Sequence, residues 1–144
     1  MKIGVYAGSF NPFHKGHYNI LLKAEQIFDK VIIARGVNPE KSTTNYIPLP
    51  NLLSDRPQMR YSGLLTDFIR NELAGYENIT LIRGLRNSTD LQYEMTQYRY
   101  FQDLMPTIQV VSIFCDKEFE HISSSGIKLL SNYGGEHVKQ YLLD

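Results

Sequence analysis

The chain has 144 residues, with fifteen basic and fifteen acidic side chains and a formal net charge of zero. This length predicts one domain, residues 1–144, with enough chain to bury a hydrophobic core. The neutral balance argues against a broad surface for nucleic acid or for a membrane. We expect a cytoplasmic protein, because the single cysteine, Cys115, can form no internal disulfide and no signal peptide or long apolar run is recognisable.

The chain opens with a short apolar run, Ile3–Ala7, which predicts a buried β-strand. A turn follows at Gly8–His17, with the sequence Gly-Ser-Phe-Asn-Pro-Phe-His-Lys-Gly-His, and apolar residues at helical spacing then predict a helix over Tyr18–Phe28. A helix start presents unpaired N–H groups and the positive end of the helix dipole, so it binds anions. Because His14 and His17 add donors there, the turn predicts a site that handles phosphate.

Two other interpretations of His14 and His17 remain open from these residues alone. The pair can be helix caps or surface histidines, since a short motif also occurs by chance. A zinc site is the weaker alternative, because no cysteine partner and no H-E-x-x-H context accompanies the pair. The motifs further along the chain favour phosphate.

The middle of the chain begins with a second predicted strand, Lys30–Ala34. The next stretch, Asn38–Pro57, contains four prolines and many small polar residues, and it predicts a long loop that acts as a lid or binding element. Lys41 near the mouth of that loop is either a cation for the substrate or a surface lysine. A short strand at Gln58–Ser62 and a helix at Gly63–Leu73 follow.

Two arginines emerge at the carboxyl end of the next predicted strand, Asn78–Arg83. Arg83 and Arg86 each offer a planar fork of donors that matches phosphate oxygens, although arginines are also common as a solvated surface pair. The following helix is predicted over Asp90–Leu104. Glu94 in its first turns either faces the same crevice or simply complements the helix dipole.

The last predicted strand, Ile108–Phe114, precedes a run of three serines, Ser123, Ser124 and Ser125, at the start of a helix that extends to about Asn132. Hydroxyls at a helix start are good N-caps, and they can also hold the outer phosphates of a nucleotide. Strands that alternate with helices predict an α/β fold: a single-domain, Rossmann-like parallel sheet flanked by helices, with ligands at the carboxyl ends of the strands.

Four segments together resemble the H-x-G-H nucleotidyltransferases, and most closely the phosphopantetheine adenylyltransferase family. They are the turn Gly8–His17, the sequence I-R-G-L-R at Ile82–Arg86, D-L-Q-Y-E-M at Asp90–Met95, and I-S-S-S at Ile122–Ser125. The first and last are typical of the whole superfamily. The middle two favour this family over its relatives.

The resemblance implies a dinucleotide-binding-like fold and transfer of AMP from ATP to 4′-phosphopantetheine, with release of pyrophosphate. It implies Mg²⁺ bound with the nucleotide, although no residue here is assigned as a metal ligand, and it allows a homo-oligomer. Catalytic roles fall on His17, Lys41 and Arg86. Positions that match the ATP site are Ser9, Phe10, His14, His17, Gly84, Leu85, Arg86, Glu94, Phe119, Ser123, Ser124 and Ser125. Positions that match the acceptor site are Ser9, Lys41, Leu65 and Arg83.

The physical chemistry agrees with such a reaction, because a phosphate is already a competent nucleophile and needs no covalent intermediate. Alignment and charge neutralisation at the α-phosphorus are sufficient, with His17 as the donor to the α-phosphate. Two alternatives remain: a related enzyme with another phosphorylated acceptor, such as nicotinamide mononucleotide, and a nucleotide-binding protein without turnover. The complete pair His14 and His17 favours the first alternative, because cytidylyltransferases and nicotinamide-nucleotide adenylyltransferases often carry both.

Overall fold

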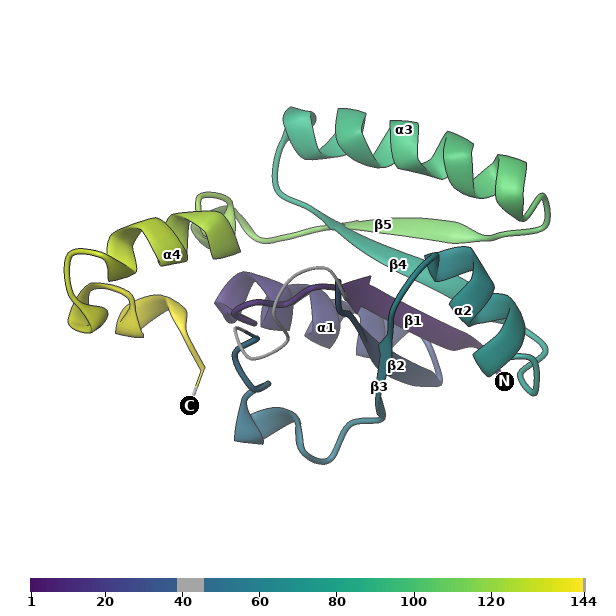
Figure 1. Cartoon of the computed structure of the whole chain (residues 1–144), viewed down its shortest axis with the longest axis horizontal. Helices are drawn as coiled ribbons and strands as arrows, with labels where there is room; N and C mark the ends of the chain where they lie inside the picture. The colour runs from purple at the N-terminus through teal and green to yellow at the C-terminus, as the bar shows by residue number, and fades with distance from the viewer. Residues whose placement is uncertain (39–45, 144) are drawn as a thin grey trace.

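Five parallel strands form the centre of the protein, in the order β3-β2-β1-β4-β5 (Figure 1). The computed structural model describes residues 1–38 and 46–143. The strands are β1 Ile3–Gly8, β2 Lys30–Gly36, β3 Gln58–Tyr61, β4 Ile79–Leu85 and β5 Val110–Phe114. This sheet confirms the predicted α/β class, including the short third strand.

Helices cover both faces of the sheet. The α-helices are α1 Lys15–Ile27, α2 Leu65–Glu72, α3 Ser88–Leu104 and α4 Ser124–Ser131, and short 3₁₀ turns lie at Asn51–Leu53, Lys117–Phe119, Gly135–His137 and Lys139–Tyr141. Helix α1 packs on one face, α2 and one side of α3 on the other, and α4 lies beyond the carboxyl ends of the strands (Figure 1, left). Within the described residues, no helix is long and apolar enough to cross a membrane.

Alternate residues of the central strands supply the two cores, because successive side chains of a strand point to opposite faces. From β1, Val5 and Ala7 pack on the α2 side, whereas Tyr6 packs on the α1 side. Every residue of β1 from Ile3 to Ala7 is buried. The strand is therefore covered on both faces, as its continuous apolar run predicts.

The outer strand β5 does not follow that expectation. Ser112 and Phe114 are exposed, and the Phe114 ring keeps 70% of its accessible surface. The exposure arises because α3, the helix beside this strand, has no buried residue and therefore covers little of the strand. A continuous apolar run therefore predicted too much cover at this edge.

Helix α1 starts earlier than the predicted Tyr18. Its first residue is Lys15 and its N-cap is His14, so the second histidine of the motif already lies inside the helix. The apolar spacing used to predict the helix does not register its first turn, which contains Gly16 and His17.

The strand order reverses direction between β1 and β4, because the chain builds outward first through β2 and β3 and then through β4 and β5. At such a point the connections after the two strands run to opposite faces of the sheet and leave a crevice at the carboxyl edge. The turn from β1 into α1 and the turn from β4 into α3 form its sides. The fold therefore brings the two motif-bearing turns together.

Candidate active site

A cavity of about 340 Å³ lies in this crevice. Its wall combines three segments that are far apart in the chain: the β1–α1 turn, the end of β4 with the start of α3, and the start of α4. Most of the predicted site residues line it: Ser9, Phe10, His14, His17, Arg83, Gly84, Leu85, Arg86, Glu94, Ser123, Ser124 and Ser125. The structure thus gathers the four sequence motifs around one space.

The two histidines cap the first turn of α1 reciprocally. The His14 Nδ1 atom accepts hydrogen bonds from the backbone N–H groups of Gly16 (3.0 Å) and His17 (3.4 Å). The His17 Nδ1 atom accepts one from the N–H of His14 (3.1 Å), and the rings stack with centroids 3.7 Å apart. The capping interpretation is therefore confirmed. It is compatible with phosphate binding, because an Nδ1 that accepts leaves the proton of a neutral ring on Nε2.

Both imidazoles are neutral at physiological pH. Burial, with the charge of Arg86, lowers the pKa of His14 to about 4. Burial lowers the pKa of His17 well below its usual range, and the neighbouring His14 and Arg86 lower it further. Each ring therefore offers an Nε2–H donor, and neither donor has a partner among the described residues. The site supplies uncharged, fixed donors rather than imidazolium ions.

Two glycines of the turn lie close to aromatic or imidazole rings. A Cβ atom on Gly16 would lie 2.9 Å from Cε1 of His14, because the His14 ring folds back over the first turn of the helix. A Cβ atom on Gly8 would lie 2.9 Å from Cε1 of Phe10 in the same way. The glycine between the two histidines thus makes room for the cap.

Phe10 links the turn to His17. Its backbone has a φ of +48°, in the left-handed region that non-glycine residues rarely occupy. The Phe10 ring meets the His17 ring edge to face, with centroids 5.0 Å apart, and Phe13 lies against His17 at 5.2 Å. Two phenylalanines therefore fix the orientation of the His17 ring.

Arg83 is paired rather than free. Its Nε and Nη2 atoms donate to the two carboxylate oxygens of Glu94 at 2.8 and 3.0 Å, and its Nη1 donates to the carbonyl oxygen of Ala7 at 3.1 Å. Arg83, which was predicted to bind the acceptor, and Glu94, which was predicted at the ATP site, thus neutralise each other's charge. A phosphate at this position has to share or replace these bonds.

Arg86 is held in a similar way by Asp90. Nε and Nη2 donate to the Asp90 carboxylate at 2.9 and 3.0 Å, and the backbone N–H of Arg86 donates to the same carboxylate at 3.0 Å. The Nη1 atom lies 3.4 Å from the carbonyl oxygen of Ile122 and reaches toward the serine motif. Asp90 lines the cavity and is a site residue that the sequence reasoning did not assign. The helical spacing rule does not reveal its pair with Arg86, because Arg86 lies before the start of α3.

Two of the three serines have structural bonds. Ser123 caps α4, since its Oγ accepts from the N–H of Gly126 at 2.9 Å, which confirms the capping interpretation for this residue. The Ser124 hydroxyl donates to the carbonyl oxygen of Pro12 at 2.9 Å. An antiparallel bridge between His14 and Leu142 adds a second link between the first turn and the end of the chain.

Two of the described residues that were predicted for the site lie away from the cavity. Leu65, the first residue of α2, is only 7% exposed and packs in the core, so its predicted contact with the acceptor is not supported by this arrangement. Phe119 packs against a small apolar cluster around Ile122 rather than lining the cavity. Lys41 lies outside the described residues. Sequence reasoning in turn missed Tyr6 and Cys115, which line the cavity from β1 and from the end of β5.

No metal cluster is found at the site. Within the part of the chain that the structure describes, no group of three histidine, cysteine or carboxylate side chains is placed to hold an ion. The oxygens of Asp90 and Glu94 are already bonded to arginines. A Mg²⁺ ion that is carried by nucleotide phosphates and water needs few protein ligands. The residues present therefore assign no metal ligand.

Comparison with known proteins gives consistent matches. Residues 5–129 match the family described as cytidylyltransferase-like. The chain is 35% identical to the phosphopantetheine adenylyltransferase of Clostridium tetani, over 94% of this chain and 87% of that protein. It is 37% identical to that of Mycoplasma capricolum, over 92% and 99%. Among solved structures, a putative nicotinate-nucleotide adenylyltransferase from Vibrio parahaemolyticus superposes with a TM-score of 0.64 at 16% identity, over 100% of this chain and 88% of that one, which shows the shared fold.

Proposed function

We propose a function from one premise: this chain belongs to the phosphopantetheine adenylyltransferase family, within the cytidylyltransferase-like group. It is a nucleotidyltransferase that transfers AMP from ATP to 4′-phosphopantetheine, giving dephospho-coenzyme A and pyrophosphate. The observation that carries this function is the single cavity in which the H-x-G-H turn, the arginine turn and the serine motif meet.

The reaction needs alignment more than chemical activation. A phosphate oxygen of the acceptor attacks the α-phosphorus of ATP, and the bond to the bridging oxygen breaks so that pyrophosphate leaves with the electron pair. The Nε2–H of His17 is the proposed donor to the α-phosphate. It is neutral and fixed by its own cap and by Phe10, so it needs no reorganisation as charge develops.

We propose that the other site residues bind the acceptor phosphate and the departing pyrophosphate. We assign the acceptor phosphate to Ser9, Lys41 and Arg83, and the departing pyrophosphate to Arg86 and the serine motif. The ion pairs Arg83–Glu94 and Arg86–Asp90 hold both guanidinium groups at the cavity before any substrate arrives. Mg²⁺ is proposed to enter with ATP, where it neutralises phosphate charge.

Self-association and a cytoplasmic location are also part of the proposal. The support for self-association is the apolar surface of α3 and β5. The exposed side chains there are Leu91, Tyr93, Met95, Tyr100, Leu104 and Phe114. The location is supported by the lone cysteine, Cys115, which is not in a disulfide.

A coupled assay for pyrophosphate tests the assignment. The chain is incubated with ATP and Mg²⁺ and, in separate reactions, with 4′-phosphopantetheine, with nicotinamide mononucleotide, or with no acceptor. We expect pyrophosphate only in the first reaction. Release with nicotinamide mononucleotide alone would transfer the function to that acceptor, and ATP binding without release in any reaction would indicate a non-catalytic nucleotide-binding protein.

A further inference from the structure

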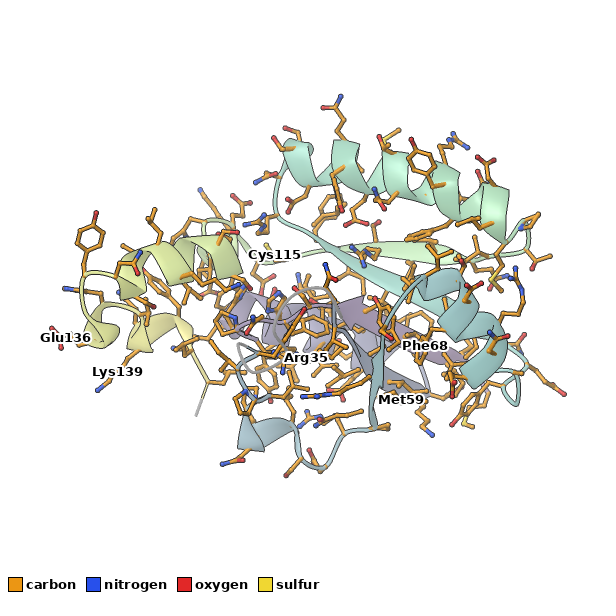
Figure 2. All side chains as sticks on the ribbon, in the orientation of Figure 1. Arg35, Met59, Phe68, Cys115, Glu136 and Lys139 are labelled. Carbon is orange, nitrogen blue, oxygen red and sulfur yellow. The ribbon has the colours of Figure 1, made fainter. Side chains whose placement is uncertain are left out.

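Arg35 is a buried arginine that the assigned reaction does not use. It lies near the carboxyl end of β2 with 1% of its surface exposed, in the crowded centre of the molecule (Figure 2). Its Nε donates to the carbonyl oxygen of Ser9 at 3.0 Å and its Nη2 to that of Phe10 at 3.1 Å. Its Nη1 is also buried and has no hydrogen-bond partner among the described residues.

The charge of Arg35 is not balanced by a carboxylate in the part of the chain that the structure describes. Its register partner on β3 is Arg60, a like charge, and the ring of Tyr46 covers the guanidinium at 5.2 Å. A buried charge without a counter-charge is costly, and a buried donor without a hydrogen-bond partner adds to that cost. Arg83 and Arg86, in contrast, each have a carboxylate. We therefore expect the buried guanidinium of Arg35 to have a function that offsets its cost in stability.

The two bonds of Arg35 bracket Phe10. The Ser9 carbonyl precedes the backbone torsions of Phe10 and the Phe10 carbonyl follows them, so one guanidinium fixes both peptide groups. The left-handed backbone of Phe10 is unfavourable for a residue with a side chain, and it persists only where its surroundings hold it. Because the Phe10 ring in turn meets His17 edge to face, a turn that relaxes also releases that histidine.

We propose that Arg35 is a positioning residue for the adenylyl transfer: it clamps the Phe10 turn and thereby aims His17 at the α-phosphate. The inference rests on the proposed function, since it adds a residue to that reaction. Arg35 touches no reacting atom in this role. Its effect is on the orientation of a group that does, so it changes kcat more than the affinity for substrate.

Two variants and a matched control test this role. Arg35→Met removes the fork and the charge, and we expect kcat to fall by about 10²-fold while KM for ATP stays within about threefold, as for a misplaced catalytic group. Arg35→Lys keeps the charge but cannot bond both carbonyls with a planar fork, so we expect kcat to recover only in part. Arg56→Met is the control, since Arg56 makes a bidentate pair with Glu25 away from the cavity. It lowers the melting temperature and leaves kcat unchanged.

The assays are run at a temperature where circular dichroism shows each variant to be folded. A folded Arg35→Met with the kcat of the parent overturns the proposal. If Arg35→Met does not fold, Arg35→Lys decides, and an unchanged kcat there overturns it as well. If the parent itself shows no turnover with any acceptor, the proposed function fails separately. Amide hydrogen exchange over residues 8–13 then decides: faster exchange in Arg35→Lys supports the clamp, and unchanged exchange refutes it.

Discussion

The turn after β1 and the turn after β4 lie on two sides of one cavity, but they present their donors in different states. After β1, His14 and His17 are neutral, bond their own backbone through Nδ1 and keep each Nε2–H without a partner among the described residues. After β4, Arg83 and Arg86 are charged and each is paired with a carboxylate. One side is ready to donate, whereas the other has to exchange partners.

The difference separates two ways to hold phosphate. A fixed neutral donor stabilises charge that appears during the reaction and requires no rearrangement. A paired guanidinium is kept in place at little net charge, and it binds an anion by sharing or releasing its carboxylate. We therefore expect the histidine side to govern the rate and the arginine side to govern binding and stability.

The largest expected effect concerns the rate. His17→Ala removes the Nε2–H donor, and we expect kcat to fall by about 10²–10³-fold, as for other single donors to developing charge. The fold should persist, because His14 still caps Gly16. A coupled pyrophosphate assay with ATP and 4′-phosphopantetheine measures the loss. Turnover near that of the parent would contradict the view that the histidine side of the cavity governs the rate.

The next effect concerns stability on the arginine side. Glu94→Gln breaks a pair whose side chains are only 20% and 13% exposed, and leaves the Arg83 charge without its partner. We expect the free energy of unfolding to fall by about 3 kcal/mol, measured by urea denaturation. The double variant Arg83→Met/Glu94→Gln is the control and should recover part of that loss. Equal losses in the single and double variants would show that the pair does not act as a unit.

A lower pH should reduce the free energy of unfolding over a defined pH range, because His14 is buried in its neutral form. Burial lowers the pKa of His14 in the folded chain from its usual value of 6.5 to about 4. Between these two pH values the unfolded chain binds a proton at His14 and the folded chain does not. The contribution of His14 to the free energy of unfolding is therefore complete above about pH 6.5 and is lost as the pH falls toward 4. We expect the free energy of unfolding to fall by about 2 kcal/mol between pH 7 and pH 5 from this residue. Urea midpoints at the two pH values measure the change. His14→Asn should make the profile less steep without flattening it, because the pKa of His17 is also lowered by burial, and an equally steep profile in that variant would contradict the assignment.

The smallest net change in stability is expected for Gly16→Ala. Alanine favours a helix by up to about 1 kcal/mol over glycine, but its Cβ displaces the His14 ring and weakens a cap worth about the same. The melting temperature should therefore stay close to that of the parent while kcat falls. A stabilised variant with full activity would show that the His14 ring can move aside freely.

The sequence predicted the fold well, because β1 and β2 contain continuous apolar runs, β4 is mostly apolar up to Ile82, and apolar residues recur at helical spacing between the strands. It was less reliable where packing decides. The start of α1 was placed too late, since histidine is not a usual N-cap and its two caps here depend on ring stacking. The exposure of Phe114 depends on how little α3 buries.

The site shows the same division. Residue types and their order along the chain indicated which segments would meet, and most of the predicted residues line the cavity. The pairing of Arg83 with Glu94 joins a strand to a helix across eleven positions, so no local spacing reveals it. Leu65 was assigned by resemblance, but it is the first residue of α2 and is buried on the apolar face of that helix. Arg35 gave no signal, because an arginine inside an apolar strand has meaning only once its carbonyl partners are known.

The links from Ser124 to Pro12 and from Leu142 to His14 have a consequence for how the protein is made. Synthesis delivers the H-x-G-H turn more than a hundred residues before these two partners. A growing chain can form β1 and α1 while the third wall of its cavity is still inside the ribosome. Nucleotide should therefore be held only by chains whose translation has passed Leu142, which separates the folding of the sheet from the onset of activity.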